Sequence, residues 1–140
     1  MDSKNVAVSS YQNKKKYKVY KKGQVIYVDF GHQPPGVQGG IRPSVVVSRN
    51  ESNHSFAPQI TVCPLSSKLK DKKVHVRLQK NDVNGYHLKS ESDILPEDMQ
   101  TVAKSAVRGA IGYVCEEKMK ELDYALALQL GLLEDDKEGA

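Results

Sequence analysis

The sequence lacks tryptophan, and it contains only two phenylalanines and two cysteines among its 140 residues. The cysteines, Cys63 and Cys115, are too few and too far apart for a disulfide framework or a paired-cysteine metal motif. No stretch approaches the roughly 18 apolar residues of a membrane span, and residues 1–22 lack the apolar segment of a secretory signal. We therefore expect a cytoplasmic protein that does not associate with a membrane.

The motifs of several common enzyme classes are also missing. The sequence contains no His-x-x-x-His pair, no Gly-x-Ser-x-Gly turn and no phosphate-binding loop that ends in Gly-Lys-Ser or Gly-Lys-Thr. Each of the histidines stands alone in the sequence, so we expect neither a metal ion nor a cofactor. His32 remains a candidate for substrate contact, because it lies in a glycine-rich segment close to Arg42.

Basic residues outnumber acidic ones by 21 to 17, which gives a formal net charge of +4 and favours an anionic partner. Six lysines between positions 14 and 22 supply much of the excess. A basic tail is more often a solvated arm than a binding site, and we interpret residues 1–20 as a flexible extension. A second basic cluster lies between two predicted strands and is the better candidate for binding; it contains Lys68, Lys70, Lys72, Lys73 and Arg77.

The chain has the length of a single domain, and its apolar pattern predicts short strands followed by one helix. Residues rich in β-branched side chains predict strands at 24–30, 43–49, 59–65 and 74–78, with weaker candidates at 88–92 and 98–103. Apolar residues spaced three and four apart predict a helix at 116–132. We expect residues 21–133 to form a small, curled, mostly antiparallel β-barrel with the helix packed on it, followed by a polar tail at 134–140.

One segment, Gln38–Ser48, has the features of a binding site. It ends a loop at 31–41 that holds four glycines and two prolines and is therefore irregular. A glycine pair gives the backbone unusual freedom, and Pro43 restricts the preceding Arg42 to extended conformations. A planar guanidinium held where a loop enters a strand suits phosphate oxygens. From the residues alone, phosphate binding and an exposed salt bridge are equally good interpretations of Arg42.

An arginine, a few hydroxyls and a basic strip suffice for one reaction, the cleavage of RNA. The substrate supplies its own nucleophile, the ribose 2′-hydroxyl, so the protein must only align the strand, stabilise charge on the phosphate and move two protons. One guanidinium contact in a dry site could supply several of the roughly 8–23 kcal/mol that enzymes remove from barriers. Ser66 and Ser67 are candidate hydroxyls, although a strand-ending turn is the commoner explanation of such a pair.

Three segments of the chain resemble the MazF/PemK family of toxin ribonucleases, over residues from about 21 to 132. They are Lys22–Asp29, Gln38–Pro43 with the strand after it, and Phe56–Ser67. The resemblance implies a mainly β fold with a C-terminal helix, a small SH3-like barrel of the PemK/CcdB toxin type. Two features depart from the family pattern: Ser66 is the smaller hydroxyl residue, and the basic N-terminal extension is additional.

The resemblance also implies roles for individual residues. It makes Arg42 the catalytic arginine and Ser66 the catalytic hydroxyl, with Ser67 as the alternative. The candidate substrate contacts in and around the same segments are His32, Gln38, Gly39, Gly40, Pro43, Asn50, Ser67, Lys68, Lys70 and Arg77.

For function, the resemblance implies a homodimer whose interface groove receives single-stranded RNA. Cleavage would be sequence-selective and independent of metal, would leave a 2′,3′-cyclic phosphate and a 5′-hydroxyl, and would be blocked by a cognate antitoxin. One alternative is a toxin of the same fold that inhibits DNA gyrase without nuclease activity, although such a protein would need neither Arg42 nor Ser66. Another is a basic β-barrel that only binds RNA or DNA.

Overall fold

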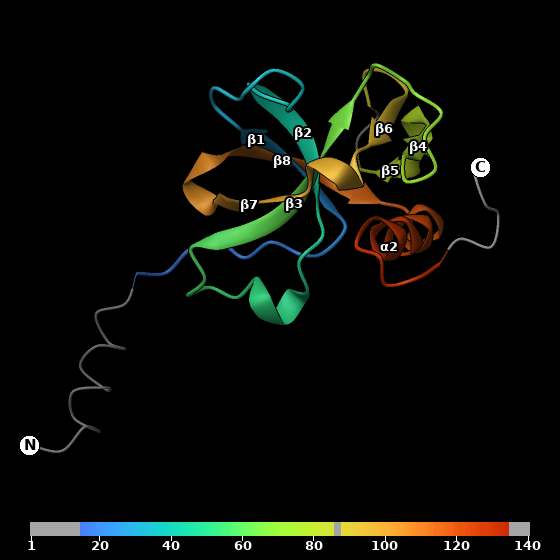
Figure 1. Ribbon diagram of the computed structural model, residues 1–140. Coiled ribbons are helices and arrows are strands. Elements are labelled where there is room, and N and C mark those ends of the chain that lie inside the picture. The colour runs from blue at the N-terminus through green and yellow to red at the C-terminus, as the bar shows by residue number, and fades with distance from the viewer. Residues whose placement is uncertain (1–14, 86–87, 135–140) are drawn as a thin grey trace, which may run out of the picture.

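A computed structural model describes residues 15–85 and 88–134 of the chain. The fold is a strongly curled antiparallel sheet with one helix packed beside it (Figure 1). Short 3-10 turns (η) interrupt the connections. In chain order the elements are β1 (Gln24–Asp29), β2 (Ile41–Val46), η1 (Asn50–Ser52), β3 (Gln59–Ser66), β4 (Val76–Leu78), η2 (Lys80–Asp82), β5 (Val83–Asn84), β6 (Ser92–Ile94), η3 (Pro96–Asp98), β7 (Gln100–Ala103), η4 (Lys104–Ala106), β8 (Val107–Val114) and α2 (Glu116–Gln129).

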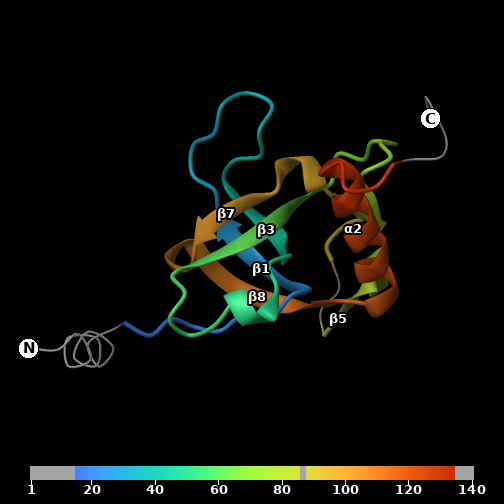
Figure 2. The same ribbon diagram turned by 60° about the horizontal axis from the view of Figure 1, so that its bottom comes forward.

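The sheet is continuous, with its strands in the order β4-β6-β3-β2-β1-β8-β5. Strand β3 divides one of its edges between two partners, because its first half pairs with β7 and its last two residues pair with β6. This division bends the sheet into a nearly closed barrel on one side and a small lobe of β4, β5 and β6 near α2 on the other (Figures 1 and 2). The predicted fold class, a mainly β curled barrel with a C-terminal helix, is confirmed.

The central strands are buried on both faces. Alternate residues of β1, β2 and β3 contribute to two separate apolar clusters, so Val45 faces one cluster and Val46 the other. The first cluster also takes in Leu122 and Ala125 of α2, which anchor the helix against the sheet. Burial on both faces explains why these strands read as continuous β-branched runs rather than as alternating patterns.

Strand β8 was missing from the elements predicted by the sequence. It pairs with β1 through two register shifts, and two of its eight residues are glycines. Glycine lowers strand propensity, yet the space at Gly112 requires it, because an added Cβ would lie 2.1 Å from the carbonyl oxygen of Asn84. Strand β5 was not predicted either, and the prediction of a strand at 88–92 is wrong except at Ser92, the first residue of β6. The remaining differences between predicted and observed strands and helix concern boundaries, and α2 ends at Gln129 rather than at residue 132.

The predicted N-terminal extension lies partly outside the described residues, which begin at Lys15. Where it is described, it lies against the barrel: the Tyr17 N–H donates to the Ser55 carbonyl at 2.6 Å, and Tyr20 is buried in the second apolar cluster. Most of the predicted tail, residues 135–140, also falls outside the described part. No helix in the described residues is long and apolar enough to cross a membrane.

Candidate active site around Arg42

The loop between β1 and β2 closes at a hydrogen-bonded neck. The Phe30 N–H donates to the Gly40 carbonyl at 2.9 Å, and the Gly40 N–H donates to the Gly31 carbonyl at 3.0 Å. Gly31 and Gly40 have φ values of +66° and +71°, in the left-handed region that glycine adopts without strain. The neck therefore fixes the point at which the loop enters β2, two residues before Arg42.

Arg42 is the second residue of β2 and pairs in register with Val28 of β1. Its half-buried side chain donates a hydrogen bond from Nε to the Gly39 carbonyl at 2.8 Å. Among the described residues, no carboxylate forms an ion pair with it. The loop thus orients the guanidinium through one nitrogen, and within the described residues the two outer nitrogens make no hydrogen bond to the protein.

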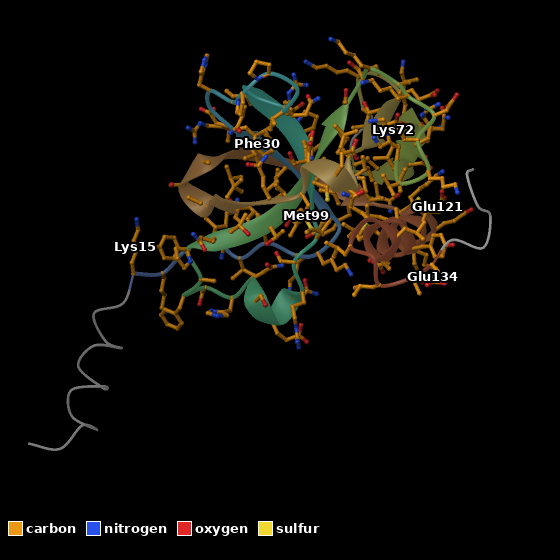
Figure 3. All side chains as sticks on the ribbon, viewed as in Figure 1. Lys15, Phe30, Lys72, Met99, Glu121 and Glu134 are labelled. Carbon is orange, nitrogen blue, oxygen red and sulfur yellow. The ribbon has the colours of Figure 1, made fainter. Side chains whose placement is uncertain are left out.

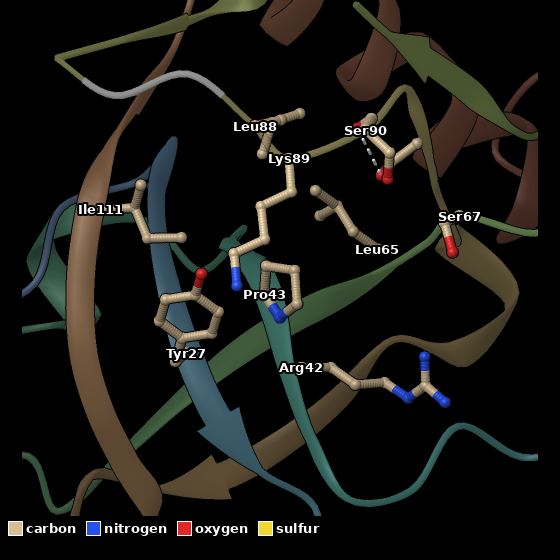
Figure 4. A pocket seen from close by; sticks show the side chains of 10 residues that line it. Tyr27, Arg42, Pro43, Leu65, Ser67, Leu88, Lys89, Ser90 and Ile111 are labelled. Carbon is tan, nitrogen blue, oxygen red and sulfur yellow. Dashed lines mark hydrogen bonds between the residues drawn. The ribbon is translucent and has the colours of Figure 1, made fainter. Parts of the chain in front are cut away.

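The Arg42 pocket has a volume of about 250 Å³, which suits one group of a nucleotide rather than a larger ligand. Figure 4 shows the Arg42 guanidinium and the Ser67 hydroxyl on the same side of it. The pocket is lined by Tyr27, Arg42, Pro43, Leu65, Ser67, Leu88, Lys89, Ser90, Ser92 and Ile111. Of these, Tyr27, Lys89 and Ser90 were absent from the sequence-based candidates, because they come from β1 and from a polar connection with no distinguishing local pattern.

The two candidate serines open on different pockets. Ser67 lines the Arg42 pocket and is exposed. Ser66 is only 6% exposed, and its hydroxyl accepts a hydrogen bond from the Lys68 N–H at 3.2 Å. Side chains alternate along a strand, and Ser67 follows Ser66, the last residue of β3, so the two serine side chains are directed to different sides of the strand.

A second, basic pocket lies beside the loop and is lined by Gly36, Gln38, Ser66, Lys68, Lys70, Lys72, His75, Leu95, Glu97 and Asp98. The candidate contacts Gln38, Lys68 and Lys70 are therefore brought together. The Gln38 side-chain oxygen is buried without a hydrogen-bond partner in the described part of the chain. Burial raises the pKa of the Asp98 carboxyl above its ordinary value, and the nearby Glu97 carboxylate adds to the rise.

Beneath the basic pocket lies a buried carboxylate, Asp93, whose side chain is 1% exposed. It accepts hydrogen bonds from Arg77 Nε at 2.5 Å and from the Lys70 N–H at 3.0 Å. His75 lies between two carboxylates, with Nδ1 3.4 Å from Asp93 and Nε2 2.5 Å from Glu97. Burial alone would raise the pKa of Asp93, but the hydrogen bonds from Arg77 and Lys70 outweigh it and hold the pKa below its ordinary value.

Five of the candidate contacts line neither pocket. Gly39 and Gly40 lie in the neck of the loop beside Arg42, and the other three are Arg77, His32 and Asn50. Arg77 is held by carboxylates, since its guanidinium also lies 3.5 Å from Asp71 and 3.5 Å from Glu91. His32 is exposed in the β1–β2 loop. Asn50, at the start of η1, accepts a hydrogen bond from the Lys22 N–H at 2.7 Å. The structure thus gathers most of the candidates at the junction of the loop with β2 and the end of β3.

The chain is similar to known proteins in sequence and in fold. Residues 21–130 match the family described as PemK-like, MazF-like toxin of type II toxin-antitoxin system. The chain is 31% identical over 114 residues to Endoribonuclease MazF of Staphylococcus saprophyticus subsp. saprophyticus, an alignment that covers 80% of this chain and 92% of that protein.

Two solved structures illustrate the likeness in fold. MazF (Form-I) from Deinococcus radiodurans is 22% identical, with a TM-score of 0.68 and coverage of 82% of this chain and 99% of that one. An endoribonuclease in complex with its cognate antitoxin, from a mycobacterial species, is 23% identical, with a TM-score of 0.67 and coverage of 84% and 100%. At these identities the likeness concerns the fold.

Proposed function

The chain belongs to the PemK-like, MazF-like family of type II toxins, and we propose that it is an endoribonuclease that cleaves single-stranded RNA at the Arg42 pocket. The name of its Staphylococcus saprophyticus relative, Endoribonuclease MazF, supports the reaction class. We further propose that cleavage is sequence-selective and independent of metal, and that the protein acts in the cytoplasm. A cognate antitoxin would neutralise it.

The observation that carries this proposal is the setting of Arg42. Its Nε is committed to the Gly39 carbonyl, so the outer nitrogens can donate two parallel hydrogen bonds to a phosphate. In the reaction, the ribose 2′-oxygen attacks phosphorus and the bond from phosphorus to the 5′-oxygen breaks. One proton leaves the 2′-hydroxyl and another is delivered to the 5′-oxygen, which yields a 2′,3′-cyclic phosphate and a 5′-hydroxyl. The guanidinium stabilises the negative charge that grows on the phosphate.

A hydroxyl at the end of β3 would assist Arg42, and two lines of support point to different residues. The shared pocket supports Ser67, which lies on the same side as the guanidinium (Figure 4). The resemblance in sequence supports Ser66, which opens on the basic pocket. Lys89 adds a second cation to the Arg42 pocket, and the lysines at 68 and 70 would bind phosphates further along the strand.

The proposal is tested with purified protein and a long RNA in EDTA, with mapping of the ends produced. We expect discrete cuts by the wild type and a loss of about 10²- to 10³-fold in rate for Arg42→Ala, the cost of removing one charge-stabilising donor. Arg42→Lys should recover little, because an ammonium cannot make two parallel hydrogen bonds. The matched control is Arg49→Ala, since Arg49 is an exposed arginine paired with Glu51, and it should cut normally.

Other outcomes would replace the proposal. A folded Arg42→Ala protein that cuts RNA at the wild-type rate would remove the mechanism. Gel shifts without cleavage by the wild type would favour a module that only binds nucleic acid. Absence of both cleavage and binding would favour inhibition of DNA gyrase, which a supercoiling assay would then measure.

We also propose that the active form is a homodimer with the substrate groove at its interface. Large apolar side chains within α2 and just beyond its end support an interface, since Tyr124 is 53%, Leu130 54% and Leu132 73% exposed. Two-fold pairing is the commonest association of small soluble proteins. The same groove, bordered by Lys68 and Lys70 of the basic pocket, would accept an acidic segment of the antitoxin in place of RNA.

A further inference from the structure

The described part of the N-terminal arm, Lys15–Lys22, is anchored to the barrel without forming a helix or strand. Two tyrosines hold it: the Tyr17 backbone N–H donates to the Ser55 carbonyl at 2.6 Å, and Tyr20 is 5% exposed in the second apolar cluster. Tyr20 is thus buried against the barrel, while the Lys15 ammonium lies 5.1 Å from the centre of the half-buried Tyr17 ring, at the outer edge of the described structure (Figure 3). The lysines of the arm repel one another, which opposes holding them together on the barrel. The anchored arm is therefore a candidate for a functional surface.

The arm presents positive charge that is not neutralised locally. Lys15, Lys16, Lys18 and Lys21 are exposed, and none forms an ion pair within the residues that the structure describes. Only Lys22, at the end of the arm, has such a partner, with its Nζ 2.8 Å from Asp123 of α2.

A further cation lies beneath the arm. Lys104 is 6% exposed, and its Nζ donates to the carbonyl oxygens of Asn53 at 3.3 Å and His54 at 3.0 Å. The same Nζ lies 5.9 Å from the centre of the Tyr20 ring. Its partners are neutral groups, so it adds to the positive potential of this end of the barrel.

We propose that the arm is a second binding surface for the RNA substrate, one that holds the strand at a distance from the cleaved phosphate through contacts with its backbone. This inference rests on the function proposed above. RNA fits this surface because exposed lysines bind the phosphates of a nucleic acid whatever its base sequence. A hollow lined in part by Gln59, Thr61 and Thr101 lies at the same end of the barrel and offers amide and hydroxyl groups.

The position of the arm sets the length of RNA that can reach it. The arm lies beside the start of β3 (Figures 1 and 2), whereas Ser66, at the end of that strand, borders the catalytic region. A strand of this length spans about 25 Å. A short oligonucleotide centred on the cleavage site would therefore miss the arm, and a longer RNA would contact both surfaces.

The experiment measures RNA binding as a function of salt, in EDTA and in the full chain carrying Arg42→Ala, so that cleavage plays no part. The arm variant combines Lys16→Gln and Lys21→Gln, because neither side chain pairs with a carboxylate in the described structure. The control combines Lys118→Gln and Lys120→Gln, which remove the same charge from α2, where both lysines pair with glutamates. Fluorescence anisotropy is recorded with one RNA of about 6 nucleotides and one of about 30.

For the longer RNA, the arm variant should lower the slope of log affinity against log salt by about 1.4, because each phosphate contact to single-stranded RNA contributes about 0.7. Between 0.05 M and 0.2 M salt, the affinity of the parent protein for the longer RNA should therefore fall by about sevenfold more than that of the arm variant. The short RNA and the control variant should show no change in slope.

Equal slopes for the arm variant and its parent on the longer RNA would overturn the inference, whether or not the wild type cleaves RNA. An equal fall in slope for arm and control variants would also overturn it, because net charge alone would then explain the effect. Failure of the wild type to cleave, combined with the predicted slopes, would remove the proposed enzyme and leave the arm as an RNA-binding surface.

Discussion

Asp93→Asn tests the buried ion-pair network beneath the basic pocket. Asparagine has nearly the same shape, so the packing around it is kept while the charge is removed. The change takes away the carboxylate that accepts hydrogen bonds from Arg77 Nε and from the Lys70 N–H. Whichever way the new amide turns, its NH₂ group faces a donor that previously met an oxygen.

The expected cost follows from burial. Removing one partner of a buried ion pair costs about 3–5 kcal/mol, and the lower end applies here because the Arg77 side chain keeps 32% of its surface in solvent. A domain of this size loses about 4 °C in Tm for each kcal/mol, so a loss of about 3 kcal/mol lowers Tm by about 12 °C. The matched control is Asp71→Asn: Asp71 lies 3.5 Å from the same arginine but is fully exposed, and its loss should leave Tm unchanged.

The assay is thermal unfolding followed by circular dichroism at a series of pH values. The pKa of Asp93 is lowered in the folded state, so the stability that it contributes is present above its unfolded pKa of about 3.9 and is lost as pH falls through the folded value. The difference in Tm between wild type and Asp93→Asn should therefore be constant from neutral pH to about pH 5 and shrink below about pH 4. A drop of less than about 3 °C at pH 7, or equal drops for both aspartates, would refute the reasoning.

Two further predictions concern the site and the assembly. Single alanine substitutions separate the serines: if the shared pocket decides, Ser67→Ala lowers the cleavage rate far more than Ser66→Ala, and the reverse result selects the residue implied by the family resemblance. Small, equal effects on cleavage would mean that the end of β3 is structural. The protein should sediment as a dimer at micromolar concentration, and dissociation should abolish cleavage; a fully active monomer would contradict the proposed interface groove.

The sequence predicts those parts of the fold whose local pattern and burial agree. β1, β2 and β3 are predicted because their β-branched runs match strands buried on both faces, and α2 because its apolar spacing matches its contact with the sheet. β8 is not predicted, because its glycines are selected by contacts with β5 and by its register shifts against β1. Tyr20 sits in a lysine-rich segment, where only the tertiary structure shows that its ring is buried.

In the site, too, the local sequence predicts some features and the tertiary structure decides the others. The local sequence makes Arg42 a candidate, because a glycine pair lies before it and a proline after it restricts its backbone. It cannot tell which of two consecutive serines faces Arg42, since this depends on the phase of β3 within the sheet. Nor does it show that Arg77 is bound by Asp93, 16 residues away, so a cation that looks available for RNA in the sequence is held by a carboxylate in the fold.

The sharing of β1, β2 and β3 between two apolar clusters has a consequence for how the molecule loses its structure. Neither cluster can open while the other stays intact, because the same three strands form a wall of both. The barrel and the small lobe of β4, β5 and β6 should therefore melt together with α2 in one cooperative transition. The amide hydrogens of β1, β2 and β3 should exchange with solvent only through global unfolding. Arg42 sits on one of these strands, so a weakening of either cluster lowers the fraction of molecules with an intact pocket without distorting it in those that remain folded.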